Sequence, residues 1–266
     1  MYDGVIFDLD GTVYVGDELI DGAERLIKDL LNSGVQVGFA TNNTTKTPGM
    51  YVTKLKRLGI SVTEDRVTNP IKPLVEWLQS GAPEAGVFAL CEQPMRDALI
   101  ESGVRLVDAA KDVGVVVASF DRTLDYHKLR TAFQALWRNP DCRLVATNLD
   151  RYCPMPGGSG EPDAGAIVAA LEASAEVKCE MVFGKPAEEL FRSACSSLGV
   201  DPQRCLMVGD RLDTDIAMAA AIGADSTLVL TGDSTRKDAA KKIKDFTPTY
   251  ILDSLADIPD AIGLSV

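Results

Sequence analysis

The sequence has 266 residues, of which 46% are hydrophobic and 25% are charged, as in a soluble globular protein with one large domain or two smaller ones. No apolar run approaches the ~20 residues of a membrane-spanning helix. The N-terminus has no basic segment followed by an apolar core, so we expect no signal peptide. The net charge of −12 argues against general nucleic-acid binding, which depends on clustered Lys and Arg.

The six cysteines form no CxxC pair and no metal-binding spacing. They stand at positions 91, 142, 153, 179, 195 and 205. Scattered thiols of this kind are typical of reduced cysteines in a cytoplasmic protein, and we expect that location.

The first element is a short apolar strand, Val5 to Phe7, which ends in two acids, Asp8 and Asp10, two residues apart. Side chains at i and i+2 of a strand point the same way, so the two carboxylates can share one small volume, where they repel unless a cation or proton lies between them. Alternatively, Asp10-Gly11 is only a hairpin turn after an edge strand.

Strands and helices then alternate at both ends of the chain. Expected helices span about 22–33, 48–58, 186–198 and 216–222, and expected strands span 35–40, 181–183, 205–208, 227–230 and 250–252. This alternation predicts an α/β fold with a mostly parallel, Rossmann-like doubly wound sheet.

Four of these apolar runs end in polar residues: Asp8 with Asp10, Thr41 with Asn42, Lys185, and Asp210. A doubly wound sheet brings such ends to one rim. Several carboxylates against one lysine require a cation, and oxygen ligands without His or Cys favour Mg²⁺. With Lys185 and the Thr41 hydroxyl, the rim suits a phosphoryl group.

Four segments together resemble the motifs of the haloacid dehalogenase-like hydrolases, most closely the NagD-like, 4-nitrophenylphosphatase branch. They are residues 8–12 (DLDGT), 41–43 (TNN), 185–186 (KP) and 209–215 (GDRLDTD). The resemblance covers both ends of the chain well and the middle more loosely.

This resemblance implies a role for each acid. Asp8 would attack phosphorus, and Asp10 would protonate the leaving alcohol and then activate water. Asp8, Asp210 and the Asp10 carbonyl would hold Mg²⁺, while Asp215 would orient the metal site or Lys185.

It also implies a phosphate site. Thr41, Asn42 and Asn43 would hold the phosphoryl oxygens, with Asn42 acting through its backbone. Lys185 would be catalytic as well, because its ammonium would neutralise Asp8 and the phosphate together.

The middle of the chain needs a fold of its own. We expect a catalytic core of residues 1–77 and 179–266, and an inserted α/β cap domain of residues 78–178. Expected cap strands span 87–90, 104–107, 113–119 and 143–147, and expected cap helices span 96–102, 124–137 and 163–175.

Residues 151–162 (RYCPMPGGSGEP) match the family loosely, and two interpretations stay open. The stretch is either a Gly/Pro-rich surface loop or a segment that faces the substrate. In the second case Asp150, Arg151 and Tyr152 would contact the leaving group.

The predicted function is a Mg²⁺-dependent phosphatase that hydrolyses small phosphate monoesters through an aspartyl phosphate. A phosphotransferase or phosphomutase with the same chemistry is the alternative, and a non-enzymatic phospho-acceptor is less favoured because it would not need Asp10 or the insertion. The expected partner is a small phosphorylated metabolite, not nucleic acid or membrane. A homo-oligomer formed through the cap is left open.

Overall fold

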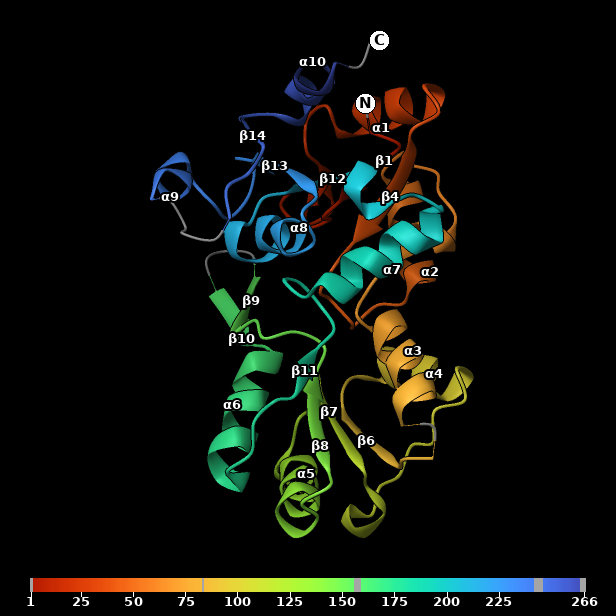
Figure 1. Cartoon of the computed structure of the whole chain (residues 1–266), viewed down its shortest axis with the longest axis vertical. Coiled ribbons are helices and arrows are strands. Elements are labelled where there is room, and N and C mark those ends of the chain that lie inside the picture. Colours follow the sequence, from red (N-terminus) through yellow and green to blue (C-terminus); the bar gives the residue numbers. More distant parts are fainter. Residues whose placement is uncertain (1, 83, 156–158, 242–245, 264–266) are drawn as a thin grey trace. The chain divides into compact units, whose positions relative to one another are not determined.

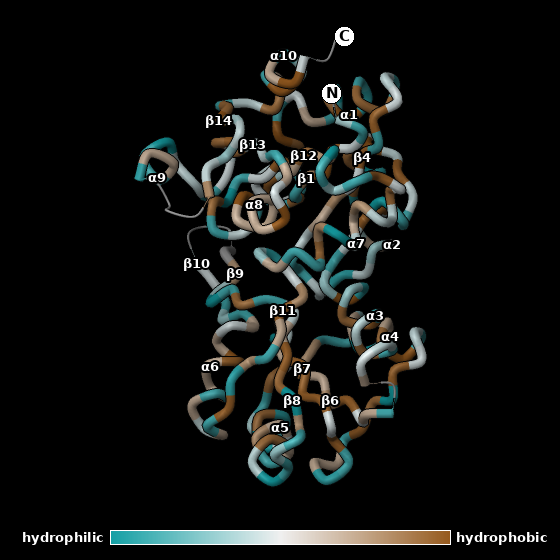
Figure 2. Tube along the Cα trace, in the orientation of Figure 1, coloured by the Kyte–Doolittle hydropathy of each residue, from teal (hydrophilic) through white to brown (hydrophobic). Residues whose placement is uncertain are grey.

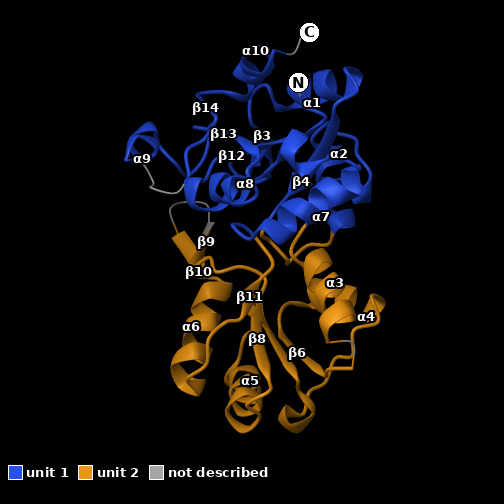
Figure 3. Ribbon diagram, in the orientation of Figure 1, with its two compact units in different colours: residues 1–41, 48–68, 185–266 blue, residues 42–47, 69–184 orange. Residues whose placement is uncertain are grey.

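The computed structural model describes residues 2–82, 84–155, 159–241 and 246–263. The chain forms two compact units (Figure 3). Unit 1 contains residues 1–41, 48–68 and 185–266, and unit 2 contains residues 42–47 and 69–184. No described helix combines the length and apolar character needed to cross a membrane.

Unit 1 is built on a six-stranded parallel sheet in the order β14-β13-β12-β1-β4-β5. Figure 1 labels the first five of these strands. The strands are β1 (Gly4–Phe7), β4 (Gln36–Ala40), β5 (Val67–Thr68), β12 (Cys205–Gly209), β13 (Asp225–Val229) and β14 (Tyr250–Leu252). The chain runs outward from β1 to β4 and returns to β12 on the other side of β1. This change of direction beside β1 is a topological switch point, where open parallel sheets bind ligands.

Alternation along β1 divides the core of unit 1 into two layers. Val5 and Phe7 pack in one apolar cluster with α1 (Ala23–Asn32) and α2 (Pro48–Arg57), whereas Ile6 packs in another with α7 (Glu188–Leu198) and α8 (Ala217–Ile222). Successive strand side chains point to opposite faces, so both faces need helices to cover them.

Shorter elements complete unit 1. They are the hairpin β2 (Tyr14–Val15) and β3 (Glu18–Leu19), a π-helical turn at Leu212–Ile216, 3₁₀ turns at Glu64–Arg66, Pro202–Arg204 and Leu255–Asp257, and the helices α9 (Arg236–Ala240) and α10 (Ile258–Ile262).

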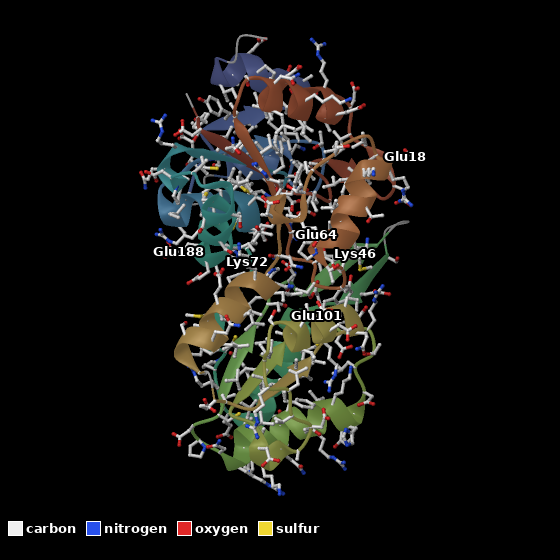
Figure 4. All side chains as sticks on the ribbon, turned by 90° about the vertical axis from the view of Figure 1, so that its right-hand side faces the viewer. Glu18, Lys46, Glu64, Lys72, Glu101 and Glu188 are labelled. Atoms are coloured by element: carbon white, nitrogen blue, oxygen red, sulfur yellow. The ribbon has the colours of Figure 1, made fainter. Side chains whose placement is uncertain are left out.

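Unit 2 has its own four-stranded parallel sheet in the order β11-β8-β7-β6. The strands are β6 (Val87–Leu90), β7 (Val115–Ala118), β8 (Arg143–Ala146) and β11 (Met181–Val182). Helices α3 (Ile71–Gly81) and α4 (Gln93–Glu101) cover one face, and α5 (Tyr126–Arg138) and α6 (Ala164–Ala175) cover the other. Strands β7 and β8 consist mainly of apolar residues (Figure 2). Charged residues are exposed in both units, for example Glu18 in unit 1 and Glu101 in unit 2 (Figure 4).

The predicted fold class is confirmed, and several elements differ from expectation. Residues 104–107 form no strand but one isolated bridge, from Leu106 to Val87. The stretch after Asp150 forms an antiparallel hairpin, β9 (Tyr152–Met155) with β10 (Ser159–Pro162); its residues 156–158 lie outside the described part of the chain. Helix α7 begins at Glu188, two residues later than predicted.

The compact units also differ from the predicted division at 77/78 and 178/179. Helix α3 buries Ile71, Leu74 and Leu78 in one cluster with Val87 and Ala89, so residues 69–77 pack with unit 2. The division into a catalytic core and a cap stays a prediction.

Candidate active site

Three of the predicted site residues follow strands at the carboxyl edge of the unit 1 sheet. Asp8 comes directly after β1, Thr41 after β4 and Asp210 after β12. Strand β1 lies between β12 and β4, and the Asp8 N–H continues the ladder by donating to the Val208 carbonyl at 2.8 Å. The edge-strand alternative for this segment is therefore wrong, because β1 is an interior strand.

Lys185 joins two of the acids into one buried group. Its side chain is 4% exposed, and its ammonium is paired with Asp8 and with Asp215 Oδ1, the latter at 2.7 Å. The π-helical turn ahead of α8 brings Asp215 to this position, where its other oxygen accepts a hydrogen bond from the Arg211 N–H at 3.2 Å. Both carboxylate oxygens of Asp215 therefore accept a hydrogen bond.

Asp210 is held in a narrow space between backbone segments. A Cβ at Gly11, where φ is +90°, would lie 2.5 Å from Asp210 Oδ2, and one at Gly232 would lie 2.0 Å from the same oxygen. That oxygen accepts a hydrogen bond from the Asp233 N–H at 2.7 Å, and Thr12 Oγ1 lies 3.4 Å from the other oxygen. Only glycine fits at positions 11 and 232, because any side chain would displace the carboxylate.

Burial shifts the ionisation of this group. Burial raises the pKa of Asp8 well above its ordinary value, with Lys185 opposing the shift. Burial and the neighbouring Asp215 carboxylate raise the pKa of Asp210 to about 6. Although burial lowers the pKa of Lys185, Asp215 and Asp8 outweigh it and leave the pKa raised. Lys185 therefore stays protonated, and its single positive charge does not neutralise the three nearby carboxylates.

The donor set fits a divalent cation. One oxygen from each of Asp8, Asp210 and Asp215 lies within 4.8 Å of the others, and all three residues are buried. These three carboxylates face the single ammonium of Lys185, so the described part of the site carries an excess of negative charge. Oxygen donors suit a hard cation, whose charge would offset both the burial and the Asp215 repulsion that raise the pKa of Asp210.

Asp10 is not part of this carboxylate group. Asp8 is buried, whereas Asp10 is exposed. The Tyr14 hydroxyl donates to Asp10 Oδ2 at 3.5 Å, and an isolated bridge joins the two residues. The shared volume for the two carboxylates stays a prediction, and the exposure of the two side chains differs.

The predicted phosphate-binding residues are divided between the units. Thr41 belongs to unit 1, is 4% exposed, and donates its N–H to the Thr68 carbonyl at 3.1 Å. Asn42 and Asn43 belong to unit 2. The Asn43 side chain accepts from the N–H of Thr45 at 2.9 Å, which uses its carboxamide oxygen in a local turn.

The predicted leaving-group residues begin before β9 in unit 2. Arg151 is exposed and Tyr152 is 54% exposed, so both offer their side chains to solvent. Asp150 is half-buried and accepts a hydrogen bond from Asn42 Nδ2 at 3.1 Å.

Some residues around the acids were not predicted. Thr231 donates its hydroxyl to the Gly11 carbonyl at 2.7 Å, and Gly232 and Asp233 surround Asp210. The signal was present in the sequence, because Thr231-Gly232 follows a predicted strand at the same edge as the other site residues. Gly232 and Asp233 act through backbone atoms, which the residue type does not reveal, whereas Thr231 acts through its hydroxyl.

Comparisons with known proteins place the chain in a family. Residues 5–105 match the haloacid dehalogenase-like hydrolases, and residues 182–258 match a HAD-hydrolase-like family. The chain is 35% identical to the sugar-phosphatase AraL of Bacillus subtilis (strain 168), over 96% of this chain and 91% of that protein. It is 32% identical to the glycerol-3-phosphate phosphatase of Gallus gallus, over 98% and 92%.

Solved structures agree with these sequence matches. The 4-nitrophenylphosphatase of Thermotoga maritima superposes with a TM-score of 0.91 at 30% identity, covering 98% of this chain and 97% of that one. The p-nitrophenyl phosphatase of Archaeoglobus fulgidus gives 0.89 at 30% identity, covering 98% and 99%. Both the sequence matches and these superpositions extend over nearly the whole chain. The chain therefore belongs to the haloacid dehalogenase-like hydrolases, in the NagD-like, 4-nitrophenylphosphatase branch, and it is a phosphatase.

Proposed function

We propose that this phosphatase hydrolyses small phosphate monoesters, with Mg²⁺ as its cation and an aspartyl phosphate on Asp8 as its intermediate. The observation that carries the proposal is the buried pairing of Asp8 with Lys185 at the switch point of the sheet. An ionised carboxylate is a competent nucleophile, and the fixed ammonium offsets the charge of both the carboxylate and an incoming phosphate.

In the first step, Asp8 attacks phosphorus and the bond from phosphorus to the ester oxygen breaks. Asp10 gives its proton to the departing alkoxide, which leaves as an alcohol. In the second step, Asp10 takes a proton from water as the water attacks the phosphorus, and the bond to Asp8 breaks to release orthophosphate. The pairing of Asp8 with the Lys185 ammonium favours the ionised carboxylate, which supports Asp8 as the nucleophile.

The cation would be held by Asp8, Asp210 and the Asp10 carbonyl, and would supply positive charge to the phosphoryl oxygens. We assign Asp215 to the orientation of Lys185, because one of its oxygens accepts from the ammonium and the other from the Arg211 N–H. Thr41 and the backbone of Asn42, with Asn43 beside it, would hold the phosphoryl oxygens.

The substrate class follows from the relatives. Two that match nearly the whole chain are named a sugar-phosphatase and a glycerol-3-phosphate phosphatase. We therefore infer that the natural substrate is a phosphorylated sugar or polyol. The scattered cysteines, with no CxxC pair in the sequence, support a reducing compartment such as the cytoplasm.

A screen of phosphorylated metabolites tests this function. The enzyme, with Mg²⁺ present, should release many equivalents of orthophosphate per active site from at least one sugar or polyol phosphate. A single equivalent, retained on the protein, would instead indicate a phospho-acceptor. Transfer to a second metabolite without orthophosphate release would indicate a phosphotransferase or mutase.

A further inference from the structure

Three polar residues of unit 2 form a closed hydrogen-bonded ring between segments that are far apart in sequence. Asn42 Nδ2 donates to Asp150 Oδ2 at 3.1 Å, and the Asp150 N–H donates to Asn148 Oδ1 at 2.9 Å. Asn148 Nδ2 closes the ring by donating to the Asn42 carbonyl at 3.5 Å. The ring ties the residue that follows Thr41 to the segment just before β9.

The surroundings hold the Asn42 side chain in one orientation. A Cβ at Gly184 would lie 2.5 Å from Asn42 Oδ1 and 2.4 Å from the Thr147 carbonyl, so the backbone at Gly184 closes one side of the amide. The segment after Asn42 is also fixed, because Thr44 Oγ1 lies 2.7 Å from Ser119 Oγ. Asn148 is 1% exposed, which makes its own position rigid.

The hydrogen bond between Asn42 and Asp150 can form in one direction only, and this determines the orientation of the Asn42 amide. The Nδ2 of an amide can only donate, and a carboxylate can only accept, so the amide orientation is set by Asp150. Hydrogen bonds to an ionised acceptor are about twice as strong as neutral ones. The carboxylate is thereby directed at Asn42, whereas Arg151 and Tyr152 extend into solvent.

We propose that Asp150 is a positioning residue for phosphate binding and that it acts through Asn42, not through contact with the leaving group. This inference rests on the proposed function, in which the Asn42 backbone N–H holds a phosphoryl oxygen. Because a peptide bond joins Asn42 to Thr41, holding the Asn42 side chain and carbonyl restricts the direction in which that N–H points. Asp150 then affects every phosphate ester alike.

Exchanging donor and acceptor tests the pair directly. Asn42→Asp alone opposes two carboxylates, and we expect kcat/KM to fall at least about tenfold, the scale of a like-charge contact. Asp150→Asn alone keeps an accepting oxygen and should have a small effect. The double variant, Asn42→Asp with Asp150→Asn, restores a charge-assisted bond in the reverse direction and should recover most of the loss.

Two readouts separate positioning from leaving-group contact. The changes in kcat/KM should be equal for 4-nitrophenyl phosphate and for glycerol phosphate. The affinity for orthophosphate, measured by calorimetry with Mg²⁺ present, should fall in Asn42→Asp and return in the double variant. Asp141→Asn, an exposed aspartate of the same unit, is the matched control and should change neither quantity.

The outcomes that overturn the proposal are distinct from those that overturn the function. A double variant no better than Asn42→Asp, in protein with the wild-type Tm, would exclude coupling of the pair to phosphate binding. A loss confined to one ester in Asp150→Ala would make Asp150 a leaving-group contact. If the wild type turned over no ester, the proposed function would fail, and the orthophosphate affinities would still decide whether the pair positions a phosphate site.

Discussion

The sheets of unit 1 and unit 2 are both parallel, both carry helices on two faces, and both end their strands in polar residues. After β1 and β12 in unit 1, the residues are Asp8 and Asp210, which form a buried group with Asp215 and Lys185. After β7 in unit 2, Ser119 joins Thr147 at 2.9 Å, and Asp121 pairs with Lys128 at 2.7 Å. In unit 1 three buried acids face one lysine, whereas in unit 2 the buried Asp121 has Lys128 as its partner.

Strand order explains this difference. In unit 1 the chain changes direction beside β1, so consecutive connections leave on opposite faces and the edge beside β1 stays open. In unit 2 the strands follow one another in sequence order from β6 to β11, and the sheet has no switch point. A parallel sheet with polar strand ends is therefore insufficient for a site; the switch point and the unbalanced charge are what distinguish unit 1.

The largest expected effect is a loss of kcat on replacing Asp8, and the matching replacement of Asp121 in unit 2 is the comparison. Asp8→Asn should lower kcat for 4-nitrophenyl phosphate by about 10⁴-fold or more, the scale for loss of a nucleophile. Asp121→Asn, the buried acid at the unit 2 edge, should cost about 1–3 kcal/mol of stability and leave kcat close to wild type. Steady-state kinetics and thermal unfolding check both. Similar losses of kcat in the two variants would contradict the comparison.

Metal removal should have the next largest effect. Excess chelator should lower phosphate release by about 10²–10³-fold, because a bound cation contributes several kcal/mol of charge stabilisation. Added Mg²⁺ should restore the rate. Calorimetry should detect Mg²⁺ binding that Asp210→Asn weakens and Asp121→Asn leaves unchanged. Full turnover by the stripped enzyme would contradict the inference from the acid excess.

Asp10→Asn tests whether the exposed Asp10 has a different role from the buried Asp8. We expect a loss of about 10²–10⁴-fold for esters with poor leaving groups, the usual contribution of a general acid and base. 4-Nitrophenolate needs little protonation to leave, so the first step should persist while hydrolysis of the intermediate slows. Mass spectrometry after acid quenching should then find a phosphoryl group on the peptide that contains Asp8. An unmodified peptide at steady state would argue against the assigned role.

The smallest effect is expected from the exposed residues of unit 2. Replacing Arg151 and Tyr152 together by Ala should change the ratio of kcat/KM values among esters by more than about tenfold, equivalent to about 1.4 kcal/mol, while Mg²⁺ dependence is kept. Arg151 offers a partner for a carboxylate or second phosphate, and Tyr152 offers a ring. An equal loss for all esters would assign these residues to folding, and no change would mean that specificity lies elsewhere.

The sequence by itself was sufficient for the fold class and for the acids after β1 and β12. Both depend on local patterns, because an apolar strand of four or five residues followed by Asp is visible without any tertiary contact. The same reasoning failed for residues 104–107, which are apolar enough for a strand but form only a single bridge. It also missed α3, whose apolar face is defined by packing against β6.

Only the tertiary structure decided which contacts the site residues make. Asp215 joins Asp8 and Lys185 because a π-helical turn changes the direction of its side chain, and periodicity does not reveal such a turn. Gly11 and Gly232 are 221 residues apart in the sequence, yet the backbone at both positions lies against the Asp210 carboxylate. Asp150 binds Asn42 across 108 residues. Contacts over such separations depend on strand order and side-chain packing, which local patterns in the sequence do not encode.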